Sequence, residues 1–342
     1  MDRKINDIFL QVEGDENSKV AAKMMFTDIL PKIKNRKLIA SHVFNNSKDE
    51  LFNWRFKKKY VMETFEELYY KGCLYLKEFI IENKVFDLNI IQNLKIANEH
   101  KCKYYVVGYN ALKEQTLHKE EQEKSVDFLI RNCKIPLVLI KDDKYRRGKG
   151  IKRFSWFVLF DRKHENCFKA FEAFLPLIDR KNDFIYAFTA IPQDGYHYED
   201  TLKKPFYAKM KELGLEENSQ FVYTCKDYTD SCAPDVEKEV NYNTKYYFDF
   251  VILYNDSYRY INGVDKSMFR MLTKLKSNIC VFSVPYIENF EPSKMVDLEE
   301  PEKVRTLVES RVAEVEKEEE MRDRKEEEMN KGDMGEGEVV NE

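Results

Sequence analysis

The sequence predicts an α/β protein in which two tandem domains, each with a five-stranded parallel sheet, are followed by a charged C-terminal helix. Two observations carry this prediction. Short apolar runs alternate with amphipathic segments along most of the 342 residues, which is typical of parallel strands connected by helices. After a stretch rich in charge near the middle of the chain, the same order of runs begins again.

The first domain, residues 1–141, contains five apolar runs that predict its strands. They are Ile8–Glu13, Lys37–Phe44, Lys77–Glu82, Lys103–Val107 and Pro136–Ile140. The segments between these runs carry apolar residues at helical spacing. This spacing predicts helices at 17–33, 51–70, 90–100 and 122–132.

A basic linker, residues 142–153, leads to a second domain, residues 154–290. Its apolar runs predict strands at Trp156–Phe160, Phe184–Thr189, Gln220–Cys225, Phe248–Leu253 and Asn278–Ser283. The helices are expected at 164–177, 205–213, 235–245 and 266–275. A repeat of this size indicates a duplicated domain and not a solenoid.

The tail, residues 291–342, is acidic, with 19 acidic and 9 basic side chains, although the whole chain has a net charge of only −4. Acids and bases mixed at i,i+4 spacing predict a charged helix at about 302–329. One narrow apolar stripe runs along it, at Val304, Val308, Val312 and Val315. This stripe could contact a protein partner, or the helix could be solvated on all sides.

The sequence lacks the motifs of common enzyme classes. It contains no GxxxxGK, no GxSxG and no HExxH, its five histidines are dispersed, and its seven cysteines form no CxxC. We therefore expect no catalytic and no metal-binding residues. Scattered cysteines are typical of reduced thiols in the cytoplasm, and no apolar run reaches the ~18 residues of a membrane helix.

Some residues have both a structural and a functional interpretation. The doublets Tyr69–Tyr70, Tyr104–Tyr105 and Tyr246–Tyr247 are expected to pack in the core and its rim, although a stacking platform for bases is the alternative. His42 is expected near a strand end with a local partner, and a ligand role is the alternative. The basic linker could contact an acidic protein surface, while the small positive charge of the body does not favour nucleic acid.

Four segments of the first domain resemble the universal stress protein family. Val12–Ser18 (VEGDENS) is similar to the family's V-D-G-S-E-x-S, and Ser41–Val43 is similar to its L-H-V. Ala97–Gly108 (ANEHKCKYYVVG) resembles A-E-E-H-x-A-D-L-I-V-V-G. Ser125–Leu139 resembles the S-V-S-E-x-V-L-R-x-A-x-x-P-V-L-V segment.

The second domain is more diverged, but Phe157–Asp161 and Asp249–Leu253 resemble the family's opening strand and its fourth strand. The resemblance covers about residues 5–287. It implies a tandem, degenerate UspA-like protein with two five-stranded parallel α/β sandwich domains of Rossmann-like type. Because the family commonly dimerises through its last strand, the resemblance also implies an internal pseudo-dimer with Pro136–Ile140 near Asn278–Ser283.

Part of this family binds ATP through G-x-x-G-x9-G-[ST] after the fourth strand, where glycines let the backbone approach phosphate. Gly108 stands in the first position, but Ala111 replaces the second glycine. In the second domain, Tyr254 and Ser257 replace the first two. The resemblance therefore implies a degenerate nucleotide site.

Eight further positions belong to the vestigial pocket that the resemblance implies. Glu13 and Asp161 stand where the family has an acid near the adenine. Val43 lies at the end of the second predicted strand of the first domain, and Ala190 follows the second predicted strand of the second domain. Lys124–Ser125 and Lys266–Ser267 recur at a helix start, where they could hold an anion or be ordinary helix-start residues.

We therefore expect a non-catalytic interaction or scaffold protein with no cofactor, whose protein partners bind the charged helix and the basic linker. The alternative is a stress-response protein that holds ATP or AMP in a remodelled pocket. An open cleft beside Gly108 or Ser267 would favour binding, and filling by Tyr109 or Tyr254 would favour the scaffold. The Lys-, Asn-, Phe- and Tyr-rich composition is typical of A+T-rich coding, as in some protists. The expected setting is cytoplasmic, with a cytoskeletal or ciliary assembly as the candidate.

Overall fold

The structure, a computed structural model, describes a large part of the body of the chain. The described residues are 8–12, 16–32, 37–45, 76–84, 89–109, 126, 129–130, 133–141, 153–160, 164–192, 199–226, 232–255 and 266–283. The predicted helices at 51–70 and 302–329, and linker residues 142–152, lie outside them. We call residues 8–141 the first half and residues 153–283 the second half.

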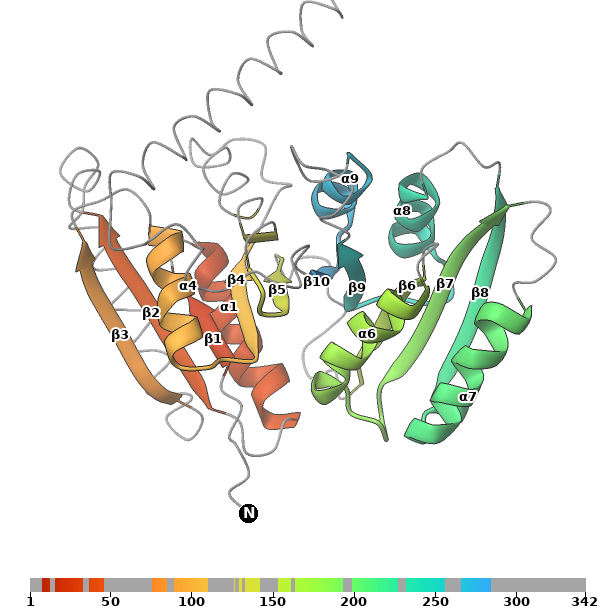
Figure 1. Cartoon of the computed structure of the whole chain (residues 1–342), viewed down its shortest axis with the longest axis horizontal. Coiled ribbons are helices and arrows are strands. Elements are labelled where there is room, and N and C mark those ends of the chain that lie inside the picture. The colour runs from red at the N-terminus through yellow and green to blue at the C-terminus, as the bar shows by residue number, and fades with distance from the viewer. Residues whose placement is uncertain are drawn as a thin grey trace, which may run out of the picture. The chain divides into compact units, whose positions relative to one another are not determined.

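Both halves contribute to one ten-stranded sheet with the order β3-β2-β1-β4-β5-β10-β9-β6-β7-β8 (Figure 1). The strands of the first half are β1 (Ile8–Gln11), β2 (Leu38–Asn45), β3 (Leu76–Lys84), β4 (Tyr104–Gly108) and β5 (Leu137–Ile140). Those of the second half are β6 (Ser155–Phe160), β7 (Phe184–Pro192), β8 (Ser219–Lys226), β9 (Phe250–Asn255) and β10 (Asn278–Ser283). All ten predicted strands are therefore confirmed, and each half has the same internal strand order.

The two halves meet where β5 pairs with β10. This pairing is antiparallel, with Val138 opposite Cys280 and Leu139 opposite Ile279, whereas every other pair of neighbouring strands is parallel. An antiparallel contact between equivalent strands is what a two-fold relation between the halves requires. The pairing agrees with the pseudo-dimer that the family resemblance implied.

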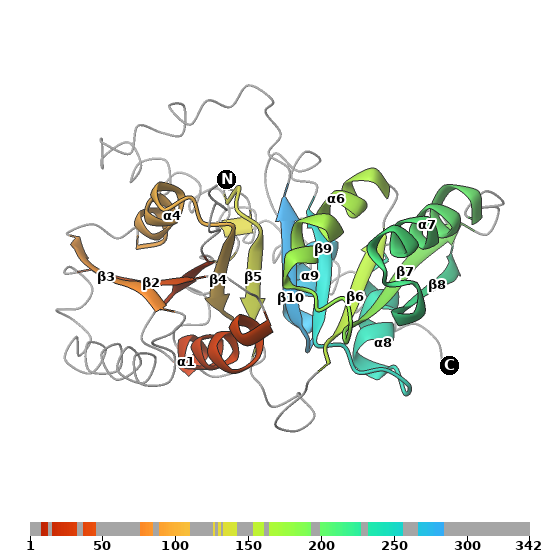
Figure 2. The same ribbon diagram turned by 90° about the horizontal axis from the view of Figure 1, so that it is seen from below.

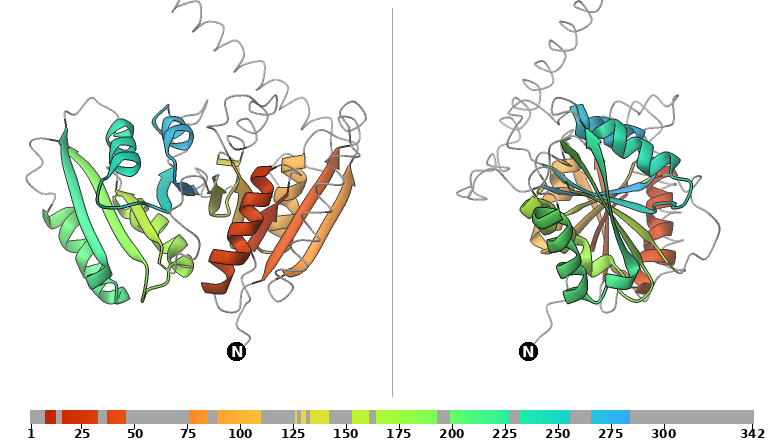
Figure 3. Two further views of the ribbon diagram at one scale, coloured as in Figure 1. Left: turned by 180° about the vertical axis from the view of Figure 1, so that it is seen from behind. Right: turned by 90° about the vertical axis from the view of Figure 1, so that its right-hand side faces the viewer.

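Helices cover both faces of the sheet, and Figure 2 shows α1 and α4 on opposite sides of the first half. They are α1 (Glu16–Met24), α4 (Asn89–Glu99), α6 (His164–Phe174), α7 (Lys204–Leu213), α8 (Ala233–Tyr242) and α9 (Lys266–Lys274). The core on one face includes residues of α1, α6 and α7, and the core on the other face includes residues of α4, α8 and α9. Figure 3 shows the strands fanning out as the sheet twists.

The predicted helices at 17–33 and 164–177 do not remain α-helical to their ends. Helix α1 continues as a π-helical turn, Met25–Ile29, and a 3-10 turn, Leu30–Lys32, and α6 ends in a 3-10 turn, Leu175–Leu177. Each 3-10 turn contains a proline, which cannot donate the next helical hydrogen bond. Helix α7 ends at Gly214, whose φ of 70° is the left-handed conformation that glycine adopts without strain.

Polar side-chain contacts also join the halves besides the strand pairing, among them that of Lys32 with Asp183 and that of Tyr104 with Ala173. The Asp183 carboxylate is fully buried before β7 and accepts hydrogen bonds from the Phe154 backbone N–H (2.9 Å) and the Trp156 indole (3.0 Å). The Lys32 ammonium of the first half lies 3.1 Å from the same carboxylate. The Tyr104 hydroxyl donates to the Ala173 carbonyl of α6 at 2.7 Å. No described helix is long and apolar enough to span a bilayer.

Candidate functional site

The sheet topology places the candidate site at the carboxyl ends of its central strands. In each half the chain reverses its direction of winding between the first and fourth strands, which are β1 and β4 in one half and β6 and β9 in the other. Ligands of open α/β sheets bind in the crevice outside the carboxyl ends of the strands at such a switch point. The residues that end these strands therefore decide what each half can bind.

Gly108 ends β4, and α1 packs directly against it. A Cβ atom at this position would lie 2.2 Å from the Asn17 carbonyl oxygen and 2.9 Å from the Ser18 nitrogen. Real Cβ atoms do not approach backbone atoms so closely. Close packing of strand against helix thus accounts for this glycine without any phosphate.

Tyrosines stand near the same point in both halves. Tyr109, which follows Gly108, is 2% exposed, and its N–H donates to the Ile140 carbonyl at 2.7 Å. Tyr254 takes the place of Gly108 in the second half. When the halves are matched at the starts of α1 and α6, Ile8 corresponds to Trp156, and their partners Tyr104 and Phe250 begin the equivalent strands. Tyr254 is half-buried and packs against the core.

The other predicted site residues are only partly described. Val43 is buried in β2, and Ala190 is half-buried in β7. Lys266 and Ser267 are the first two residues of α9, but their side chains lie outside the described part of the chain. The remaining predicted positions lie wholly outside it: Glu13, Ala111, Lys124, Ser125, Asp161 and Ser257.

Buried polar contacts lie near the carboxyl end of β1 and in the middle of β2, and only a partner for His42 was expected from the sequence. The Tyr105 hydroxyl donates to the Gln11 side-chain oxygen, and the Ser41 hydroxyl donates to the Asn93 side chain of α4 at 2.9 Å. His42 Nδ1 lies 2.5 Å from the Val12 carbonyl, to which it can only donate. His42 was expected to have a local partner at a strand end, but it lies within β2 and its partner is 30 residues away in the chain. The sequence signal for these contacts was the presence of a glutamine, a serine and a histidine in otherwise apolar runs.

The second half has apolar residues at most of the equivalent positions. The strand registers match Tyr105 with Val251 and Gln11 with Leu159. Ser41 and His42 correspond to Phe188 and Thr189 by the same registers, and all four second-half residues have little exposed surface. The two halves therefore differ chemically at the place where this fold binds ligands.

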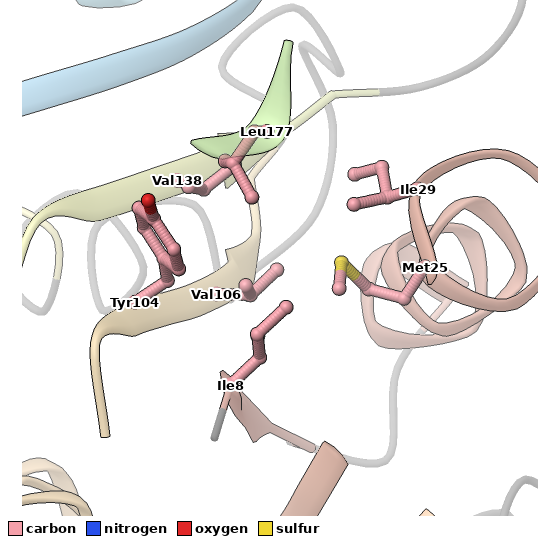
Figure 4. A pocket seen from close by; sticks show the side chains of 7 residues that line it. All are labelled: Ile8, Met25, Ile29, Tyr104, Val106, Val138 and Leu177. Carbon is pink, nitrogen blue, oxygen red and sulfur yellow. The ribbon is translucent and has the colours of Figure 1, made fainter. Parts of the chain in front are cut away.

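A small cavity lies between β1, β4, β5 and the π-helical turn (Figure 4). Its volume is about 10 Å³, and it is lined by Ile8, Met25, Ile29, Tyr104, Val106, Val138 and Leu177. A space of this size holds at most about one water molecule, which would need polar partners that this lining lacks. Ligand pockets are larger by a factor of ~30 or more, so this gap cannot hold a nucleotide.

The described residues also offer little reactive chemistry. They contain no group of three or more His, Cys, Asp or Glu side chains that could hold a metal ion. Burial raises the pKa of the Cys133 thiol to about 12, so this cysteine stays protonated and is a poor nucleophile near neutral pH. The Tyr186 hydroxyl donates to Glu239 at 2.5 Å, and burial with this carboxylate raises the Tyr186 pKa.

No family model matches the sequence, and no curated protein matches it. Solved structures do. A universal stress protein from Archaeoglobus fulgidus DSM 4304 has a TM-score of 0.56 and 12% identity, over 82% of this chain and 99% of that one. A universal stress protein in complex with cAMP matches 40% of this chain and 97% of its own, with a TM-score of 0.29 and 15% identity.

The cytoplasmic domain of a prokaryotic cation chloride cotransporter has a TM-score of 0.44 and 12% identity, over 81% of this chain and 95% of that one. At such low identities the comparisons establish the fold alone. The chain has a universal-stress-protein-like α/β fold, and the A. fulgidus structure matches it over both halves.

Proposed function

We propose that this chain is a non-catalytic interaction protein, in which two universal-stress-like halves form an internal pseudo-dimer and bind protein partners instead of ATP. The observation that carries the proposal is the packing of Gly108. The one motif glycine that the first half retains is needed by the Asn17 backbone of α1, which lies 2.2 Å from where its Cβ would be. Its presence is therefore no argument for a phosphate site.

The second half supports the same proposal. Tyr254 stands at the position of the first motif glycine, and its side chain packs on the core. Phosphate binding requires a residue without a side chain at this position, so that the backbone N–H groups can approach the anion. Gln11, which ends β1 at the switch point, corresponds to the apolar Leu159, and Ser41 beside it corresponds to Phe188. A pair of equivalent nucleotide sites is therefore not expected.

We assign the binding role to the acidic tail and the basic linker, and we expect a cytoplasmic setting with a cytoskeletal or ciliary assembly as the candidate. The tail carries 19 acidic side chains and one apolar stripe. A stripe of this kind can insert into a groove of a partner protein, with the charged residues around it setting specificity.

Two variants of the full-length chain with the same added charge test this role. Val308→Asp places a carboxylate on the stripe, whereas Ser310→Asp places it about 200° around the predicted helix. Affinity capture from the source cells, quantified by mass spectrometry, should recover the same partners with Ser310→Asp as with the wild type. Val308→Asp should lower their recovery about tenfold or more.

Equal recovery with both variants would contradict a partner site on the stripe. Recovery of tubulin or other cytoskeletal proteins would support the proposed setting, and recovery of unrelated partners would remove it while leaving the interaction role.

A further inference from the structure

Lys141 is a buried amine at the contact between the halves. It directly follows β5, and the residue is 4% exposed. Its backbone N–H donates to the Asn278 side chain of β10 at 2.9 Å. Its Nζ donates to the carbonyls of Leu272 and Leu275, each at 2.5 Å, at the C-terminal end of α9. A first-half side chain therefore binds the end of a second-half helix.

The opposite half makes the same contact with neutral groups. Ser283 corresponds to Lys141 by the strand registers, and Ile130 corresponds to Leu272 by its place before the last strand. The Ser283 hydroxyl donates to the Ile130 carbonyl at 3.1 Å, and Asn255 Nδ2 lies 3.4 Å from the same oxygen. In each half, a residue at the end of the last strand thus donates hydrogen bonds to carbonyls at a helix end of the other half.

This reciprocity indicates that the contact does not need a charge. Two carbonyls accept two hydrogen bonds from Lys141, and a neutral amine can supply both. Carbonyls at a helix C-terminus favour a cation, but they offset only part of the cost of burying an unpaired ammonium.

No ion pair joins Lys141 to an acidic side chain of the described residues. The described titratable groups on and beside the elements packed around it include Tyr104, Tyr105, Tyr109, Cys133, Asp249, Arg270, Lys274, Lys276 and Cys280. The buried Asp249 carboxylate accepts a hydrogen bond from the Ser155 N–H at 2.9 Å. The Tyr109 ring centroid lies 5.7 Å from Nζ. Arg270 and Lys274 are on the exposed side of α9, and Arg270 pairs with Glu237.

The two cysteines do not titrate near neutral pH. Burial raises the pKa of Cys133 to about 12 and that of Cys280 well above its usual value, and Cys280 faces the core on the other side of the sheet. Burial lowers the pKa of Lys141 itself to about 7.

We propose that Lys141 is a pH-sensitive latch between the two halves, closed by its neutral amine and weakened when the amine is protonated. The sign follows from proton linkage. The unfolded chain binds the proton up to pH ~10.4, whereas the folded chain releases it above pH about 7. This group therefore makes the fold more stable as the pH rises from about 7 to about 10, by up to about tenfold in the unfolding constant per pH unit.

Denaturant unfolding of the full chain between pH 6 and pH 9 tests the latch. Wild type and Lys141→Met should diverge, with the ratio of their unfolding constants changing by about 100-fold across this range. Ser283→Ala is the matched control, because it removes the equivalent bond but leaves Lys141 in place. Its pH dependence should follow the wild type. Parallel profiles for wild type and Lys141→Met would overturn the proposal.

A direct titration of Lys141 in the wild-type chain tests the proposal without the Lys141→Met variant, in case that variant does not fold. The side-chain carbon signals of labelled lysine are followed by NMR in the wild-type chain, and Lys141 is assigned by its contact with the Tyr109 ring. A midpoint near pH 7 supports the latch. A midpoint near the ordinary lysine value of ~10.4 overturns it.

Discussion

Gly108 shows how one residue can have two explanations with different consequences. A glycine that only admits phosphate can be replaced by alanine without loss of stability. A glycine against which a helix packs cannot, because the added methyl group overlaps the backbone. The 2.2 Å distance from the virtual Cβ to the Asn17 oxygen favours the second explanation.

We expect Gly108→Ala to lower the free energy of unfolding by about 3 kcal/mol, at the upper end of the usual cost of overpacking, because α1 must shift away from β4. Gly214→Ala is a useful control. Nothing lies within 4 Å of its added Cβ, and only the positive φ opposes the substitution, at a cost of about 1–2 kcal/mol. Urea unfolding measures both. A neutral Gly108→Ala would contradict the packing explanation.

The contacts of single residues were harder to predict from the sequence than the strands and helices. Lys141 precedes a charged linker and resembles a linker residue in the sequence, because nothing local indicates that α9 will cover it. The polar cluster of Gln11, Ser41 and His42 depends on contacts between segments far apart in the chain. The need of a buried His42 for a partner was predictable, but the Val12 carbonyl that serves it, 30 residues away, was not.

The secondary-structure elements were predictable because the core strands are continuous apolar runs. The doublet Tyr104–Tyr105 is buried within β4, as expected, and Tyr246 packs on Phe184 with ring centroids 5.0 Å apart. The π-helical turn after α1 was not predictable, because its residues have the same helical spacing as those before it. Tertiary packing decides such a local change of winding.

The register of β5 on β10 is the element-level feature that joins the halves, and a disulfide can test it. Val138 lies opposite Cys280, and both side chains belong to the same core. Val138→Cys should therefore form a disulfide with Cys280, since paired residues on one face of a sheet are close enough. The oxidant must be present during refolding, because burial raises the Cys280 pKa and leaves little thiolate in the folded chain.

Leu139→Cys is the control for this cross-link. Leu139 points into the core on the other face of the sheet, so its cysteine should not reach Cys280. Peptide mapping under non-reducing conditions distinguishes the two. Cross-linking through position 139 in place of 138 would contradict the register.

At the scale of the whole molecule, the sequence predicted two similar halves, and the structure joins them in one ten-stranded sheet. Alternating strands and helices predict the fold because they leave few ways to cover a parallel sheet. The chemical difference between the halves was less accessible. It depends on which polar residues lie at equivalent strand ends, and this requires the registers of the sheet.

The central claim is that the two universal-stress-like halves no longer bind adenine nucleotides. Calorimetric titration of the full-length chain with ATP, ADP and AMP, with and without Mg²⁺, tests it most directly. We predict no saturable heat up to millimolar nucleotide. Saturable binding at micromolar concentrations would contradict the account and identify a working site at the strand ends.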